Sequence, residues 1–126
     1  MKIGHDENYL SITPNDESDP YSGFAIMAGC GYDDSVFTGS NGTVHFDKSP
    51  EAEASFAEFE ALQRNSTRIN LTEGCSIQLS RQSRGDIEVA FQISRYRLGA
   101  NLSGLIVVEG ENSSGFLREL RLLAFR

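Results

Sequence analysis

The stretch Ile87-Glu-Val-Ala-Phe-Gln-Ile93 places an apolar side chain at every second position. A period of two is typical of a β-strand with one face in the core. Arg84-Gly-Asp86 forms a turn before this stretch, and Leu102-Ser-Gly-Leu-Ile-Val-Val-Glu109 follows it. We therefore predict two consecutive strands, and the Ile-Val-Val run favours a central place for the second one.

The remaining strands are predicted outward from this pair. Apolar residues alternate with polar ones, or gather in short runs between turn residues, over residues 9–13, 23–32, 67–71 and 76–80. Residues 23–32 carry the densest apolar run of the first half, which favours a central strand. Residues 37–46 allow two interpretations: a tight hairpin closed by Asn41-Gly42, or a single edge strand with a bulge at Gly42. We favour the single strand.

Two helices are predicted from their capping and spacing signals. Ser49 can cap a helix that begins at Pro50, and acidic residues occupy its first turn. This helix is expected to span residues 50–64 and to bury Phe56, Phe59 and Leu62. The second helix is expected over residues 114–124, capped by Ser113 or Ser114. Its predicted apolar face comprises Phe116, Leu117, Leu120, Leu123 and Ala124.

The order of these elements predicts the fold class. The connections between consecutive strands are too short for βαβ crossovers, so the strands should pair antiparallel. We predict a single α+β domain over residues 1–126, with a largely antiparallel sheet of about 5–7 strands and helices over 50–64 and 114–124 packed on it. Residues 1–8 are expected to be a flexible terminus.

The charge of the chain is divided unevenly between its halves. The 126 residues carry 11 basic and 18 acidic side chains, a net charge of −7. Residues 1–60 hold twelve acids and two lysines, a net of −10, whereas residues 61–126 hold six acids and nine arginines, a net of +3. An acidic protein is repelled by a phosphate backbone, so we expect no nucleic-acid partner. The two acidic clusters predicted to lie in loops are Asp16, Glu17 and Asp19, and Asp33 with Asp34.

The sequence contains no catalytic or metal-binding motif. Cys30, His45 and Asp47 would form a nucleophile, base and orienting acid if neighbouring strands brought them together. Cys30, however, lies in an apolar strand, where a thiol is usually inert. The acidic loops lack the spacing of an EF-hand, and the glycines lack the context of a phosphate-binding loop. We therefore expect a protein without enzymatic activity, metal or cofactor.

The order of elements resembles the WapI-like group of small bacterial immunity proteins. The resemblance covers roughly Gly23 to Leu123: Phe37-Thr-Gly leads through Val44-His-Phe into Phe56-Ala-Glu-Phe-Glu-Ala-Leu, and the second half ends in Gly-Phe-Leu-Arg-Glu-Leu-Arg-Leu-Leu. This resemblance implies a stoichiometric inhibitor that binds and blocks a co-encoded toxin domain. It supplies no catalytic residue.

These observations lead to three functional hypotheses. The first is a protein-binding domain that presents Asp16, Glu17, Asp19, Asp33 and Asp34 to a basic partner such as a toxin. The second is a small ligand-binding or hydrolytic domain with a cleft at Cys30, His45 and Asp47. The third is a structural subunit, marked by a long exposed edge strand. No apolar run approaches the length of about eighteen residues that a membrane span needs, and the start lacks the apolar core of a secretory signal, so a cytoplasmic location is expected.

Overall fold

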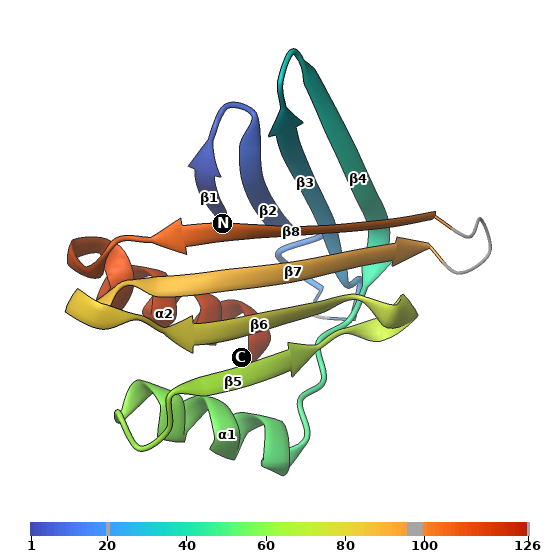
Figure 1. Ribbon diagram of the computed structural model, residues 1–126. Coiled ribbons are helices and arrows are strands. Elements are labelled where there is room, and N and C mark those ends of the chain that lie inside the picture. The colour runs from blue at the N-terminus through green and yellow to red at the C-terminus, as the bar shows by residue number, and fades with distance from the viewer. Residues whose placement is uncertain (20, 96–99, 126) are drawn as a thin grey trace.

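In the residues that the structure describes, the chain forms two four-stranded antiparallel sheets and two α-helices (Figure 1). The computed structural model describes residues 1–19, 21–95 and 100–125. The first sheet contains, in spatial order, β1 (Lys2–His5), β2 (Asn8–Pro14), β3 (Phe24–Tyr32) and β4 (Ser35–Val44). The second contains β5 (Ser66–Asn70), β6 (Ser76–Arg81), β7 (Ile87–Arg95) and β8 (Ala100–Val108). Helix α1 (Pro50–Glu60) lies between the sheets in the chain, α2 (Gly110–Ala124) follows β8, and the short helices η1 (Thr72–Gly74) and η2 (Ser83–Gly85) join strands of the second sheet.

The α+β class is confirmed, but the expectation of one sheet of about 5–7 strands is wrong. The eight strands divide into two sheets because β4 and β5 do not pair with each other. Helix α1 intervenes in the chain, and the segments that follow β4 and β5 meet at an isolated bridge between Phe46 and Leu71. Strand patterns in a sequence show which residues alternate, and they do not show where a sheet is interrupted.

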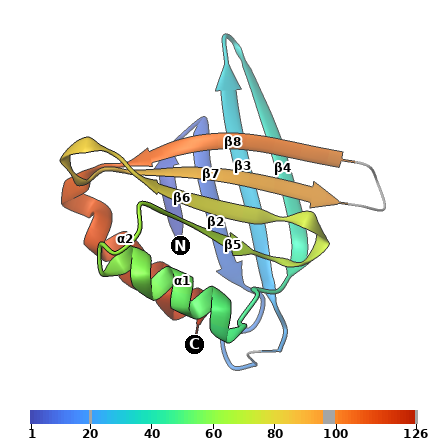
Figure 2. The same ribbon diagram turned by 60° about the horizontal axis from the view of Figure 1, so that its bottom comes forward.

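The hydrophobic core lies between the sheets and the helices. The strands of the two sheets cross steeply, and both helices lie on one side of the second sheet (Figures 1 and 2). The predicted alternation in β7 is confirmed, since Ile87, Val89, Phe91 and Ile93 are all buried. One continuous cluster of buried residues includes Leu10 and Ile26 of the first sheet together with residues of the second sheet and both helices. The two sheets thus share a single core.

Strand β8 is an edge strand, contrary to the central position predicted from its Ile-Val-Val run. It pairs antiparallel with β7 over its whole length, from Ala100 opposite Arg95 to Val108 opposite Ile87. Its apolar content is divided between the two faces: Ile106 and Val108 are buried, whereas Leu105 and Val107 are each 52% exposed. The apolar run therefore does not mean that both faces of β8 are buried: one face lies in the core, and the apolar side chains of the other face are exposed.

Two other strand predictions are confirmed. Strand β3 lies inside the first sheet, between β2 and β4. Strand β4 is a single edge strand, and its register against β3 shifts between the Phe24–Val44 and Ile26–Asn41 pairs. This shift inserts one extra residue into β4, so the predicted bulge lies at Gly42 or next to it.

Helix α1 begins as predicted but ends four residues earlier, at Glu60 instead of Arg64. The side chain of Ser49 accepts a hydrogen bond from the Ala52 backbone N–H, and Pro50 occupies the first turn. Leu62 adopts a left-handed φ of 63°, and the N–H of Gln63 reaches back to the carbonyl of Glu58, which closes the helix in a Schellman arrangement. Leu62 is consequently exposed rather than buried, whereas Phe56 and Phe59 are fully buried as predicted.

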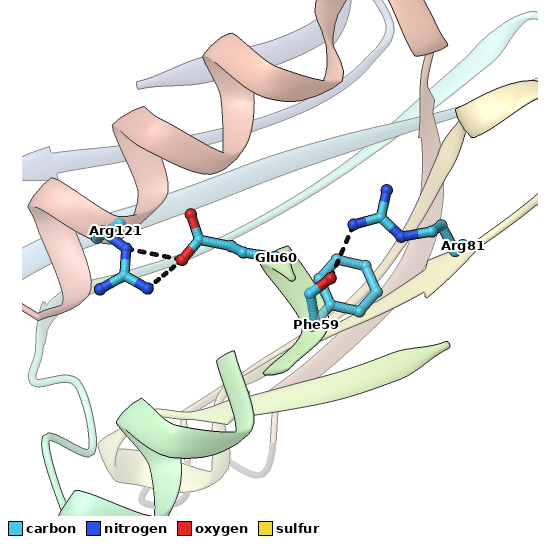
Figure 3. A network of polar contacts seen from close by, with 4 residues as sticks. All are labelled: Phe59, Glu60, Arg81 and Arg121. Atoms are coloured by element: carbon cyan, nitrogen blue, oxygen red, sulfur yellow. Dashed lines mark hydrogen bonds and ion pairs between the residues drawn. The ribbon is translucent and has the colours of Figure 1, made fainter. Parts of the chain in front are cut away.

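Two arginines of the second half attach α1 to the rest of the protein (Figure 3). The Arg81 guanidinium of β6 donates to the Phe59 carbonyl at 2.8 Å, and it lies 4.6 Å from the centroid of the Phe59 ring. The Arg121 guanidinium of α2 donates from two nitrogens to the Glu60 carboxylate. An arginine of the basic second half, Arg121, thus pairs with an acid of the first half, Glu60.

Helix α2 begins at Gly110, four residues before the predicted start. The cap comes from a distant residue, because the Asp86 carboxylate accepts a hydrogen bond of 2.7 Å from the Gly110 N–H. A Cβ atom at Gly110 would approach the Arg84 carbonyl to 2.6 Å, so only glycine permits this contact with the turn before β7. Four residues of the predicted apolar face are buried: Phe116, Leu117, Leu120 and Ala124.

The first eight residues, expected to be a flexible terminus, contain β1 and the turn into β2. Lys2–His5 pairs antiparallel with Asn8–Ser11. The Met1 amino group donates to the Ile12 carbonyl at 2.9 Å, and the Ile12 N–H donates to the Met1 carbonyl at 2.8 Å. The strand is only four residues long and includes a glycine, so its sequence carries little strand signal.

Candidate functional site

The structure separates the two predicted acidic clusters. Asp16, Glu17 and Asp19 lie in the loop between β2 and β3, whereas Asp33 and Asp34 form the turn between β3 and β4. The nine residues of β3 lie between these two connections. At about 3.3 Å per residue, the clusters are about 30 Å apart, at opposite ends of the strand. The five acids therefore do not form one patch.

The described residues of the β2–β3 loop, 15–19, 21 and 22, are here called the acidic loop and are held by hydrogen bonds of their own side chains. The Asn15 amide donates to the Ser22 carbonyl, which joins the two ends of the loop, and to the Gly42 carbonyl, which ties the loop to β4. The Asp16 carboxylate accepts from the hydroxyl of Ser18 at 2.7 Å and from its backbone N–H at 2.9 Å. Asp19 accepts from the Tyr21 N–H at 2.9 Å. These turns give the loop a defined shape without burying its carboxylates.

The same bonds favour the ionised form of Asp16. The Ser18 hydroxyl and then the Ser18 N–H lower the pKa of the Asp16 carboxyl below its ordinary value. Asp16, Glu17 and Asp19 are all exposed. The acidic loop therefore presents fixed negative charge to the solvent.

The acidic loop lies against the start of α1 and the end of α2. Asp16, Glu17 and Asp19 line a small hollow together with Lys48 and Leu123. Glu51 and Glu53 occupy the first turn of α1, directly after Lys48 in the chain. Acids from two separate segments thus gather at this end of the molecule, which we call the acidic end: Asp16, Glu17, Asp19, Glu51 and Glu53.

The acidic loop also exposes an aromatic residue that the sequence did not single out. Tyr21 is 88% exposed, the most exposed large apolar side chain among the described residues. Exposed tyrosines are common anchors of protein interfaces because a rigid ring buries much area at a low entropic cost. The signal in the sequence was the isolated Tyr21 within an acidic, turn-forming stretch, which periodicity alone does not detect.

Cys30, His45 and Asp47 are not brought together. Cys30 lies opposite Phe37 in the β3–β4 ladder, and its Sγ lies 3.9 Å from the carbonyl oxygen of Ser103 in β8. His45 follows Val44, which pairs with Phe24 at the other end of β3, about 20 Å away along the strand. The Asp47 carboxylate accepts a hydrogen bond from the Ser49 N–H ahead of α1. The geometry does not provide the nucleophile–base contact that a hydrolytic cleft at these residues requires.

The other cysteine, Cys75, is buried in the core next to β7. The Ser94 N–H donates to its sulfur at 3.4 Å, and burial raises the pKa of the thiol. A buried thiol with a raised pKa is a poor nucleophile. Within residues 1–19, 21–95 and 100–125, no group of three or more His, Cys, Asp or Glu side chains is arranged to hold a metal ion. None of the helices in these ranges is long and apolar enough to cross a membrane.

Comparison of the chain with protein-family models, with curated proteins and with solved structures finds no match.

Proposed function

We propose that this protein is a non-enzymatic protein-binding domain that recognises a basic partner through its acidic end. The observation that carries this proposal is the acidic loop: an ordered, charged segment with Tyr21 projecting into solvent. The contact of an immunity protein with a co-encoded bacterial toxin is the specific form that we propose. In this form the acidic end would compete with the anionic substrate of a toxin that acts on nucleic acid.

Each feature of the loop has a physical role in such a contact. Carboxylates on a basic partner's approach path raise the association rate, and the rate then falls with added salt. A loop already fixed by its own hydrogen bonds pays little ordering entropy when it binds. The Tyr21 ring can fill an apolar pocket of the partner, which slows dissociation.

The test compares the acidic loop with the hairpin turn at the opposite end of β3. One variant carries Asp16→Asn, Glu17→Gln and Asp19→Asn, substitutions that keep side-chain shape and leave an acceptor for Ser18. The comparison variant carries Asp33→Asn and Asp34→Asn and removes two charges instead of three, so the losses are compared per charge removed. The partner used is the protein encoded beside this chain's gene, and binding is followed by stopped-flow and calorimetry at low and high salt.

We expect the loop variant to lower the association rate about tenfold at low salt, and the difference to shrink at high salt. Tyr21→Ala should raise the dissociation rate and cost about 2 kcal/mol of binding free energy. The hairpin variant should change both rates little. An equal loss per charge removed from both variants would mean that total charge, rather than the acidic loop, governs binding, and an unchanged rate in the loop variant would refute the proposal.

A further inference from the structure

The exposed edge of β8 lacks the features that usually protect an edge strand. Edge strands are commonly guarded by charged residues, proline or a bulge, because their free backbone groups can pair with another chain. Strand β8 reads Ala-Asn-Leu-Ser-Gly-Leu-Ile-Val-Val and contains neither charge nor proline. Its register against β7 runs without a shift over all nine residues. In the part of the chain that the structure describes, this edge of the second sheet is therefore long, regular and uncharged.

The direction of the β8 backbone groups follows from the contacts of β7. The Ser94 N–H and carbonyl both contact the Cys75 sulfur, so the backbone groups of Ser94 point toward β6. Because backbone groups alternate along a strand, Ile93 and Phe91 point toward β8 and bond to Leu102 and Gly104. The N–H and carbonyl groups of Ser103, Leu105 and Val107 then point away from β7. The Cys30 sulfur of β3 lies 3.9 Å from the Ser103 carbonyl oxygen, which agrees with this direction and means that this one carbonyl already contacts the first sheet.

A groove of about 630 Å³ lies along this edge. Leu105 to Glu109 form one wall and Lys2 to His5 of β1 form the other, and the first turns of α2 close one end. A second hollow, of about 500 Å³, adjoins Asn101 and Leu102 at the other half of β8 and is lined by Phe37 of β4. Both halves of the edge thus border open space wide enough for an extended chain.

The charge at the groove favours a basic residue at one end of the occupant. Glu109 and Glu119 line the end of the groove next to α2, and Glu119 lies 3.8 Å from the Met1 amino group. Lys2 also lines the groove, but its ammonium group lies 4.9 Å from the centroid of the Tyr9 ring. The walls formed by Leu105 to Val108 are uncharged. The groove therefore has an apolar wall along β8, a more polar wall along β1, and two acids at the α2 end.

We propose that the β8 edge is a docking site for an extended segment of a partner protein, which adds to the second sheet as a fifth strand. The segment alternates apolar and polar residues and carries a lysine or arginine at its amino end, since antiparallel pairing places that end beside Glu109 and Glu119. The first sheet extends past β8 (Figure 1) and would obstruct a second whole copy that approached this edge, which favours a single segment. This site is separate from the acidic end and does not depend on it.

The probe is the peptide Lys-Val-Thr-Val-Thr-Val-Thr, blocked at both ends and titrated into the full-length protein with amide NMR detection. We expect saturable binding below about 1 mM, with the largest shifts at Ser103, Leu105 and Val107. The reversed sequence, with lysine at the carboxyl end, should bind more weakly. A peptide methylated on alternate backbone nitrogens should not bind, because it keeps the side chains but loses the ladder hydrogen bonds.

Val107→Lys should weaken binding about fivefold or more, because it places a charge on the apolar edge and beside the peptide lysine. Val36→Lys is the matched control: Val36 is 45% exposed on β4, the edge strand of the other sheet, and its replacement adds the same charge. Thermal unfolding verifies that both variants fold. Absence of binding, shifts confined to other strands, or equal affinity in the two variants would overturn the proposal. So would a dimer in sedimentation that Val107→Lys dissociates, since the edge would then serve a second copy.

Discussion

The two edges of the second sheet, β5 and β8, differ in what covers them. Strand β5 carries Arg68 and polar side chains, and α1 packs against it. Ser55 of α1 and Thr67 of β5 share a hydrogen bond of 2.6 Å, and Arg81 holds the Phe59 carbonyl behind it. Strand β8 is uncharged and is bordered by two hollows, one of which is closed at its end by the first turns of α2. The polar edge is covered and the apolar edge is open.

The composition of an edge strand therefore does not indicate whether other segments of the chain cover it: the more polar edge, β5, is the one that α1 covers. The covering of β5 depends on contacts from residues far apart in the chain, and these contacts contribute to folding stability. The open side chains of β8, Leu105 and Val107, contribute little to the core and remain available for binding. We therefore expect substitutions at the β5 edge to change stability and substitutions at the β8 edge to change association.

The largest expected effect is from Phe59→Ala. The Phe59 side chain is fully buried between α1 and the second sheet, so its loss should cost about 3–5 kcal/mol of unfolding free energy. The matched change at the open edge, Leu105→Ala, should stay within about 0.5 kcal/mol. Urea unfolding measures both. Similar costs at the two positions would contradict the assignment of stability to the β5 edge.

A smaller effect is expected from Arg81→Met. Methionine keeps an apolar stem over the Phe59 ring but removes the donor to the Phe59 carbonyl, which should cost about 1–3 kcal/mol. Hydrogen exchange should accelerate first at the end of α1. Arg68→Met serves as the control, because Arg68 is exposed on β5 and its guanidinium donates to Asn70 and Ser76 rather than to α1. If Arg68→Met destabilised the protein as much, the contact with α1 would not be the cause.

The smallest effect is expected from Glu60→Gln. The Glu60–Arg121 pair is partly exposed, so neutralising it should cost about 0–1 kcal/mol. The Glu60 carboxylate also raises the pKa of Arg121 by its hydrogen bonds, so the guanidinium stays charged at every pH at which the protein is studied. The cost should shrink at high salt, measured by urea unfolding. A cost above that of Arg81→Met would show that the ion pair, and not Arg81, attaches α1.

Local signals in the sequence predicted most of the elements. The period of two in β7, the cap at Ser49, and the bulge in β4 are properties of neighbouring residues, and each is confirmed. The predictions that failed required partners distant in the chain. Helix α2 starts early because Asp86 caps it, and β8 is an edge because no further strand pairs with it in the described part of the chain.

The candidate sites divide in the same way. The acidic loop was predicted from its composition, whereas its separation from Asp33 and Asp34 follows from the length of β3. Tyr21 and the groove along β8 were not predicted, because exposure depends on what the rest of the chain covers. An apolar run such as Ile106-Val-Val108 has the same sequence pattern at the centre of a sheet and at its edge.

The sequence by itself determined the α+β class, most strands, the start of α1 and the location of the acidic segments, because these depend on residue spacing and on local hydrogen bonds. Only the tertiary structure decided that the strands divide into two sheets, that β5 is covered while β8 is open, and that Cys30 and His45 lie far apart. These outcomes depend on long-range packing, in which each surface is buried or exposed according to segments that lie elsewhere in the chain.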